Sequence, residues 1–244
     1  MNAAAIIPAR YDSTRFPGKL LADRTGQPLI RHVWEQARQA QRVARLLIAT
    51  DDSRIAAAAR EFGAEVVLTA ASHANGTSRI EEAVRLAGVR QEIIINVQGD
   101  EPTIDPALID AVAETLMADT GAPVATIASP LDSPEDEANP NVVKVVRALN
   151  GRALYFSRSS IPFQRSLPAP PRLRHVGLYA YRREFLPVYV GLTPTSLEQA
   201  ESLEQLRILE HGHAIAVAVR NSTHCGIDTP EQYERFVASY GTAG

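Results

Sequence analysis

The stretch AAAIIPARYDSTRFPGK at residues 3–19 begins as an apolar run and continues into a turn that contains arginine, serine, glycine and lysine. Further apolar runs follow as RLLIAT at 45–50, EVVL at 65–68 and EIIINV at 92–97. These runs are continuous rather than alternating, as expected for parallel strands that helices cover on both faces. The sequence therefore predicts an α/β fold with a doubly wound, mixed and mostly parallel sheet.

Helical spacing separates the apolar runs. It predicts helices near 28–40, 53–61, 77–87 and 106–118. The pattern then becomes β-rich, with candidate strands at 122–131, 141–148 and 152–157 and a proline-rich segment at 166–174. We predict one α/β domain over residues 1–244, with an inserted β-rich region at about 122–182.

The last part of the chain returns to the earlier pattern. Helical spacing recurs at 196–211, and AIAVAV at 214–219 is typical of a strand. A C-terminal helix is expected to begin at Pro230, because proline suits the first helical turn.

The composition excludes several classes of protein. Of the 244 residues 45% are hydrophobic and 22% are charged, and no apolar run approaches the roughly 20 residues of a membrane span. The first residues lack a signal-peptide pattern, so a cytoplasmic enzyme is expected. The net charge of −3 argues against a general nucleic-acid binder. Cys225 is the single cysteine, so a disulfide within the chain and a zinc cluster are excluded, and any metal should be a hard cation on carboxylates.

Lysine is rare in this chain. Among 25 basic residues only Lys19 and Lys144 are lysines. A coding bias explains the excess of arginine, but a compact ammonium differs from a planar guanidinium in the contacts that it makes. Both positions are therefore candidates for sites that require a point charge.

The turn after the first run predicts a phosphate site. Arg10, Ser13, Arg15 and Lys19 lie within one turn, and loops at the carboxyl ends of parallel strands form the ligand crevice of such sheets. The turn lacks both the dinucleotide glycine fingerprint and the Walker pattern. The alternative is a solvated basic loop, which the clustering disfavours.

A second candidate follows the fourth apolar run. NVQGDEP at 96–102 brings Asp100 to the end of a buried strand. One or two carboxylates together with phosphate oxygens suffice to bind Mg²⁺. A plain turn that uses Asp and Gly is the competing interpretation.

Taken together, these segments resemble the CMP-Kdo synthetases, which are 3-deoxy-manno-octulosonate cytidylyltransferases. The resemblance runs from residue 5 to about residue 236. It is carried, in the family's order, by PARYDSTRFPGKLL, HANGTSR, NVQGDEP, NPNVVKVV, ALYFSRSSIPF, RHVGLYAYR, LEQAESLEQLR and GIDTPEQYE.

The resemblance implies a nucleotide-diphospho-sugar-transferase-like fold, CTP as co-substrate, Mg²⁺ as cofactor, and a homodimer built on the inserted β-rich arm. It also implies a role in lipopolysaccharide synthesis, in which CMP is transferred from CTP to 3-deoxy-D-manno-octulosonate (Kdo). Catalytic roles are implied for Lys19, Asp100, Asp228 and Arg10, with Asp100 and Asp228 as the metal ligands. Binding of CTP is implied for Arg10, Ser13, Arg15, Lys19, Gly76, Thr77, Arg79 and Gln98. Binding of the sugar acid is implied for Arg158, His175, Tyr179, Glu204 and Gln205.

The chain departs from the family pattern in two places. Ser78 stands where the family more often has an acidic residue, and Ala74 and Asn75 replace a Gln or Ser. The segment between Pro162 and Arg174 is shorter than in other family members. An amino-sugar relative of Kdo, a sialic acid, or nucleotide binding without turnover therefore stay open as alternatives.

Several candidates also have a simpler structural interpretation. His175 suits a strand histidine with one hydrogen bond, Asp228 an N-terminal helix cap, Lys144 a strand-stabilising residue, and Cys225 a small buried residue. The i, i+3 spacing of Glu198, Glu201, Glu204 and Arg207 is typical of a solvated, salt-bridged helix face.

Overall fold

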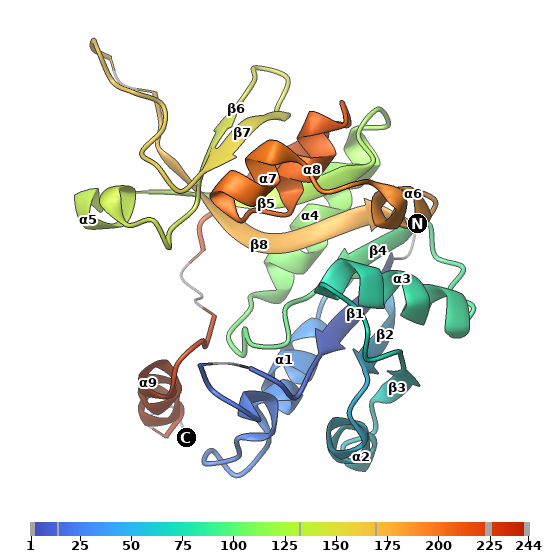
Figure 1. The fold of residues 1–244 in the computed structure, drawn as a ribbon. Helices are drawn as coiled ribbons and strands as arrows, with labels where there is room; N and C mark the ends of the chain where they lie inside the picture. The colour runs from blue at the N-terminus through green and yellow to red at the C-terminus, as the bar shows by residue number, and fades with distance from the viewer. Residues whose placement is uncertain (1–2, 14, 132, 169, 223–225, 242–244) are drawn as a thin grey trace. The chain divides into compact units, whose positions relative to one another are not determined.

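A computed structural model describes residues 3–13, 15–131, 133–168, 170–222 and 226–241. The chain divides into two compact units. Unit 1 comprises residues 1–110 and 223–244, and unit 2 comprises residues 111–222; Figure 1 colours them along the chain. The prediction of a single domain with an insertion stays a prediction.

Parallel strands form the sheet of unit 1 in the order β3-β2-β1-β4. They are β1 (Ala3–Ala9), β2 (Val43–Thr50), β3 (Glu65–Leu68) and β4 (Ile93–Asn96). The register pairs Ile6 of β1 with Leu47 on one side and with Asn96 on the other. The consecutive residues Ile6 and Ile7 are both fully buried, so both faces of β1 are covered, as its continuous apolar run predicts.

The predicted helices of unit 1 are present. They are α1 (Leu29–Ala37), α2 (Ser53–Glu61), α3 (Gly76–Leu86) and α9 (Pro230–Tyr240), while α4 (Pro106–Ala118) begins in unit 1 and ends in unit 2. A short 3-10 helix, η1 (Lys19–Leu21), was not predicted. Side chains cap the ends of several helices: Asp52 accepts from the amide of Arg54 at 2.8 Å, and Asn75 accepts from the amide of Ser78 at 2.9 Å. These caps fix where the loops before α2 and α3 end.

Unit 2 contains a mixed sheet. Its elements are β5 (Val124–Pro130), α5 (Pro134–Ala138), β6 (Lys144–Arg147), β7 (Ala153–Ser157), β8 (Leu173–Arg182), α6 (Phe185–Gly191), α7 (Ser196–Glu201), α8 (Gln205–Glu210) and β9 (Ile215–Val219). Strand β5 runs parallel to β9 and antiparallel to β8, whereas β6 and β7 form an antiparallel hairpin off this path. Within the predicted insertion, β5 and β8 therefore share a sheet with β9, and the hairpin branches from this sheet through the pairing of Lys144 on β6 with Arg174 on β8.

The helical segment at 196–211 is interrupted. Ser202 has a φ of 50°, a left-handed conformation that ends α7, and α8 begins at Gln205. The uninterrupted helical spacing of the sequence does not predict this break. It changes which acidic side chains share a face.

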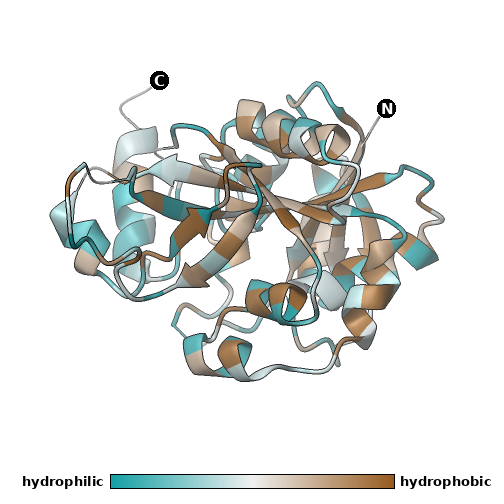
Figure 2. Cartoon of the chain, turned by 90° about the horizontal axis from the view of Figure 1, so that it is seen from above, coloured by the Kyte–Doolittle hydropathy of each residue, from teal (hydrophilic) through white to brown (hydrophobic). Residues whose placement is uncertain are grey.

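Hydropathy follows this organisation in each unit. In Figure 2 many strand segments are brown, the colour of hydrophobic residues, whereas many connecting loops are teal, the colour of hydrophilic residues. Among the residues that the structure describes, no helix is both long enough and apolar enough to cross a membrane.

Candidate active site

Three loops of unit 1 pack against one another where β1 and β4 end. A Cβ atom on Gly99 would lie 3.1 Å from the carbonyl oxygen of Pro8, and one on Gly76 would lie 3.2 Å from the Pro8 ring. Such distances are too short for a side chain to fit without movement of its neighbour. Glycine at 76 and 99 therefore lets the loop after β1, the start of α3 and the loop after β4 approach closely, as the predicted crevice requires.

The basic turn after β1 is shaped by Gly18. This residue has a φ of 69°, and its amide donates to the carbonyl of Tyr11 at 3.1 Å. A Cβ atom at this position would lie 3.0 Å from the Tyr11 hydroxyl. The turn therefore needs glycine both for its left-handed backbone and for the close approach of Tyr11.

The predicted phosphate residues divide into two groups. Arg10 and Ser13 line a cavity of about 340 Å³ together with Asp12 and Pro17. Arg15 and Lys19 instead point to Asp228, whose carboxylate lies 2.8 Å from the Arg15 guanidinium. The first group borders a space large enough for phosphate groups, while the second group is ion-paired in this structure.

Lys19 brings together the two predicted metal-binding carboxylates. Its ammonium lies 2.5 Å from Asp100, 3.6 Å from Asp228 and 2.7 Å from the carbonyl oxygen of Ile227, to which it donates. Asp100 and Asp228 are 128 positions apart in the sequence, yet both face one cation. The part of the chain that the structure describes contains no group of three or more His, Cys, Asp or Glu side chains that could hold a metal. A two-carboxylate site for a hard cation, completed by substrate oxygens, fits this arrangement.

Asp228 does not serve as the helix cap that its sequence context allows. Thr229 is the N-cap of α9, and its hydroxyl accepts from the amide of Gln232, whose side chain in turn accepts from the amide of Thr229. The Asp228 side chain is left to pair with Arg15 and Lys19. Asp228 therefore lies within the predicted capping sequence, where its backbone amide donates to the Gln232 side chain at 2.6 Å, but the capping side chain is that of Thr229.

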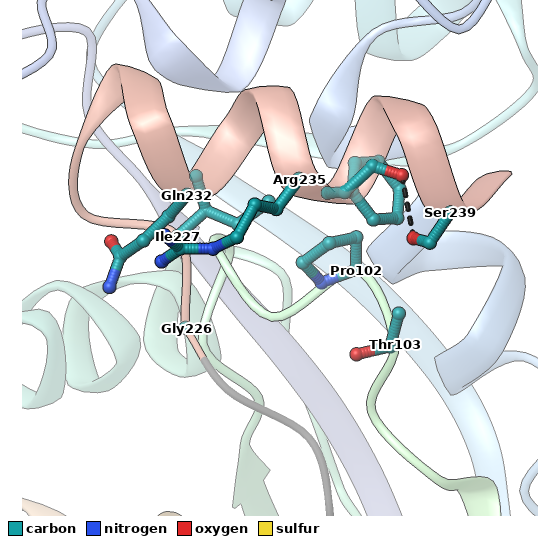
Figure 3. Close-up of a pocket in the computed structure, with 8 residues that line it drawn as sticks. Pro102, Thr103, Gly226, Ile227, Gln232, Arg235 and Ser239 are labelled. Atoms are coloured by element: carbon teal, nitrogen blue, oxygen red, sulfur yellow. Dashed lines mark hydrogen bonds between the residues drawn. The ribbon is translucent and has the colours of Figure 1, made fainter.

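A second cavity of unit 1 adjoins these groups. It measures about 230 Å³, and Figure 3 shows Arg235 and Ser239 of α9 on one side with Pro102 and Thr103 on another. Ile227, whose carbonyl accepts from Lys19, also lines it. Its lining residues Pro102, Gly226, Ile227 and Gln232 belong to the motifs NVQGDEP and GIDTPEQYE, but none of the lining residues is among the predicted site residues.

The predicted cytidine-binding residues lie near the start of α3. Arg79 is only 5% exposed, and its guanidinium pairs with Asp51 at 3.2 Å and donates to the Thr69 hydroxyl at 2.7 Å. Thr77 is buried, and Gln98 follows β4. Arg79 thus ties α3 to the ends of β2 and β3. Sequence reasoning missed Asp51 as its partner, although its place directly after a strand was a usable signal.

Two residues that depart from the family pattern, Ser78 and Asn75, belong to one local network. Ser78 donates to the Asn75 carbonyl at 3.0 Å and contacts the His73 imidazole at 3.2 Å. The other ring nitrogen of His73 lies 2.6 Å from Glu82, and this contact lowers the pKa of the Glu82 carboxyl. Ser78 and Asn75 therefore have a structural role at the N-terminus of α3. The acidic residue of this network is Glu82, which contacts His73.

The predicted sugar-acid residues all belong to unit 2. His175 and Tyr179 lie on β8, and their rings are 5.3 Å apart. Burial lowers the pKa of His175 to about 3, so its imidazole is neutral near pH 7. Its Nε2 contacts the Thr126 hydroxyl at 3.0 Å. Whatever His175 binds, it binds as a neutral hydrogen-bonding group rather than as a cation.

Aromatic side chains connect Tyr179 with α8. Tyr179 stacks on Tyr181 at 6.0 Å, Tyr181 contacts Tyr189, and the Tyr189 hydroxyl donates to Glu204 at 3.3 Å. Burial raises the pKa of Tyr179, and the nearby Glu204 carboxylate adds to this effect. Gln205 is buried beside Glu204 at the start of α8. The tertiary structure thus gathers Tyr179, Glu204 and Gln205 in one region.

Arg158 is bound by backbone oxygens. Its guanidinium donates to the carbonyls of Glu201 at 2.6 Å, Pro140 at 3.0 Å and Ser202 at 3.3 Å. The Glu201 carboxylate accepts from the Arg158 amide at 2.9 Å and from the Ser157 hydroxyl at 2.6 Å. Arg158 therefore joins the end of β7 to α7 and has a fixed direction.

The predicted solvated, salt-bridged face of acidic residues is confirmed in its ion pair and in the exposure of Glu204, but not in the exposure of Glu198. Glu198 is 7% exposed and forms an ion pair with Arg207 at 2.5 Å, while Glu201 bonds to the end of β7. The break at Ser202 separates these residues onto two short helices. Cys225, predicted to be a small buried residue, lies outside the described residues.

Residues 4–215 match the family model described as cytidylyltransferase. A 3-deoxy-manno-octulosonate cytidylyltransferase of Syntrophobacter fumaroxidans is 50% identical over 240 residues, which cover 97% of this chain and 96% of the relative. One of Aliivibrio fischeri is 49% identical over 244 residues, covering 96% and 97%.

The chain belongs to the 3-deoxy-manno-octulosonate cytidylyltransferase family. Its fold agrees with this membership. A solved structure of CMP:2-keto-3-deoxy-manno-octonic acid synthetase complexed with CTP matches with a TM-score of 0.94 and 41% identity, covering 100% of both chains. A putative glucose-1-phosphate thymidylyltransferase of Bacillus anthracis, 15% identical, matches with a TM-score of 0.67 and covers 98% of this chain and 95% of its own. The second match supports the mixed α/β fold of nucleotidyltransferases.

Proposed function

We propose that this chain transfers CMP from CTP to the anomeric hydroxyl of Kdo and releases CMP-Kdo and pyrophosphate. The observation that carries the proposal is the convergence of Lys19, Asp100 and Asp228. A basic group beside two carboxylates, in the same turn as Arg10 and Ser13, which line a cavity, suits a reaction between polyanions. Relatives of nearly equal length, 50% and 49% identical, bear the name of this activity.

The reaction is a displacement at the α-phosphorus of CTP. The anomeric oxygen of the sugar acid forms a bond to that phosphorus as the bond to the β-phosphate oxygen breaks. Pyrophosphate leaves with the electron pair, and the hydroxyl proton passes to solvent. Charge repulsion is the main barrier, so the chain's contribution is to position the reactants and to neutralise charge.

We assign the basic turn to the triphosphate. Arg10 and Ser13 would contact phosphate oxygens in the cavity that they line, and Arg15 and Lys19 would neutralise the charge of the departing pyrophosphate. Gly76, Thr77, Arg79 and Gln98 would bind the cytidine. The Arg79 guanidinium already pairs with Asp51 and donates to Thr69, so Arg79 would act on the cytidine indirectly, by fixing the loops after β2 and β3.

Asp100 and Asp228 would hold Mg²⁺. The fit rests on the ammonium of Lys19, which shows that a single cation can contact both carboxylates. When bound, Mg²⁺ would stabilise the charge of the α-phosphate and lower the pKa of the attacking hydroxyl.

The sugar acid is assigned to the unit 2 residues. Arg158 would attract its carboxylate, neutral His175 would form a hydrogen bond, and Tyr179, Glu204 and Gln205 would bind hydroxyl groups. Each of its three guanidinium nitrogens already donates to a backbone carbonyl, so Arg158 would act on the carboxylate through its charge and its two remaining N–H groups.

We also propose a homodimer and a cytoplasmic role in lipopolysaccharide synthesis. Support for the dimer comes from large apolar side chains that are exposed within the β-rich region. Leu149 is fully exposed, and the exposed fractions of Leu154, Phe163 and Leu167 are 62%, 88% and 82%. Where such side chains gather into a patch, they are typical of surfaces that another chain covers.

The decisive experiment measures pyrophosphate release from CTP and Mg²⁺ with Kdo, 8-amino-Kdo or a sialic acid, each with and without EDTA. Release with Kdo that EDTA abolishes is expected. Release with only another sugar acid would replace the acceptor, and binding of CTP without any release would contradict catalysis.

A further inference from the structure

The Lys19 ammonium is surrounded by oxygen atoms that would suit a metal ion. The Asp100 carboxylate, the Ile227 carbonyl and the Asp228 carboxylate lie 2.5, 2.7 and 3.6 Å from its nitrogen. The Lys19 side chain is only 11% exposed, so water screens this charge little. Carboxylate and carbonyl oxygens are the ligands that hard divalent cations take in proteins.

This ammonium and a divalent cation compete for the same carboxylates. A dication on Asp100 and Asp228 would lie within a few ångströms of Lys19, where two positive charges repel strongly at low dielectric. Lys19 has a flexible four-carbon stem, so its charged end can leave without movement of the backbone. Its stem begins in the turn whose residues Arg10 and Ser13 line the cavity proposed for the triphosphate.

We propose that Lys19 acts as an internal counter-cation: in the nucleotide-free protein it fills the cation position between Asp100 and Asp228. On arrival of a nucleoside triphosphate it turns to the phosphates and frees both carboxylates. The identity of the triphosphate rests on the proposed function. The competition between Lys19 and a divalent cation for the two carboxylates does not. Its consequence is that a divalent cation binds weakly to the free protein, and that nucleotide and cation assist each other's binding.

The first test measures binding of Mn²⁺ alone by electron paramagnetic resonance, with neither nucleotide nor sugar present. Lys19→Met should bind Mn²⁺ at least about five-fold more tightly than the unaltered protein, the lower end of ordinary coupling between sites. Lys19→Arg keeps the charge and should stay near the unaltered protein. Arg60→Met removes an equal charge from an exposed position on α2 and controls for net charge.

The same gain should disappear in the double variant Lys19→Met, Asp100→Asn, because the gain depends on that carboxylate. The inference is overturned if Lys19→Met gains nothing. It is also overturned if Lys19→Arg or Arg60→Met gains equally, or if the double variant keeps the gain. Thermal unfolding of each variant checks that the fold is retained.

The second test uses the scarcity of lysine. Protein labelled with ¹⁵N-lysine contains only two side-chain ammonium groups, those of Lys19 and Lys144, and Lys19→Met assigns them. Saturating CTP in the presence of EDTA should move the Lys19 signal and leave that of the fully buried Lys144 in place. An unmoved Lys19 signal, at a CTP concentration shown by equilibrium dialysis to saturate the protein, would overturn the inference.

Failure of the proposed function gives a different pattern. Absence of pyrophosphate release with any sugar acid would remove the reaction, yet the Mn²⁺ result would stand, since that experiment contains no substrate. Release of pyrophosphate together with unchanged Mn²⁺ binding in Lys19→Met would keep the reaction and remove the counter-cation.

Discussion

The ammonium of Lys144 donates a hydrogen bond to the carbonyl oxygen of Arg158 at 2.5 Å. It also donates to the carbonyls of Asn139 at 3.0 Å and Val142 at 2.6 Å, so three backbone oxygens take its three protons. The side chain is fully buried, and burial lowers its pKa. Lys144 thus joins the segment before β6 to the residue that we assign to the sugar carboxylate.

Replacement of Lys144 by Met should therefore affect the acceptor selectively. Three carbonyls would lose their donor, and the free energy of unfolding should fall by about 2 kcal/mol or more. The KM for the sugar acid should rise several-fold, while the KM for CTP stays unchanged. Lys144→Arg should not restore either value, because a planar guanidinium cannot reproduce the ammonium's three directions.

Arg147→Met on the same strand is the matched control, since Arg147 is exposed and donates to the Val217 carbonyl. Steady-state kinetics and urea unfolding make the comparison. An equal rise in both KM values would contradict a selective role of Lys144.

Asp100→Asn should remove most turnover and leave the fold intact. The variant keeps the shape of the side chain and loses the charge that pairs with Lys19 and that we assign to Mg²⁺. Pyrophosphate release measures turnover, and circular dichroism checks the fold. Asp105→Asn is the control: Asp105 accepts from the Ala107 amide at 2.8 Å, and asparagine caps a helix equally well. A kcat near that of the unaltered protein in Asp100→Asn would refute the assignment.

Gly18→Ala should weaken CTP binding as well as stability. The left-handed backbone at Gly18, with a φ of 69°, costs an alanine about 1 kcal/mol, and its Cβ would press on Tyr11. Gly26→Ala has a similar backbone cost at a φ of 87°, but nothing lies within 4 Å of its Cβ. Both variants should be less stable in urea, and the KM for CTP should rise in Gly18→Ala alone. A similar rise in both would exclude a specific role of the turn.

His175 should make the protein sensitive to acid. Its pKa falls from 6.5 in the unfolded chain to about 3 in the folded one, so the unfolded state binds more protons between these values. The stability that this group contributes is complete above about pH 6.5 and is lost as the pH falls toward 3. Between pH 7.5 and pH 5, the free energy of unfolding in urea should fall by about 2 kcal/mol less in His175→Gln than in the unaltered protein. The exposed His211→Gln should behave like the unaltered protein.

The sequence by itself determined the strands and helices of unit 1. Its continuous apolar runs predict covered parallel strands, and Pro230 marks the start of the C-terminal helix. The family motifs named the candidate site residues. The local sequence pattern was sufficient for these elements, because strand burial and helix starts are both encoded by residues that are close together in the sequence.

Only the tertiary structure decided the partners of the charged side chains. The i, i+3 spacing of Glu198, Glu201, Glu204 and Arg207 predicts a solvated, salt-bridged helix face. The Glu198–Arg207 ion pair is present, but the left-handed Ser202 divides the helix, and the Glu201 carboxylate instead accepts from Ser157 at the end of β7. Likewise, no local pattern places Lys19 between Asp100 and Asp228. Ion pairs between distant residues depend on how the chain folds back, and that arrangement is fixed by packing rather than by spacing along the sequence.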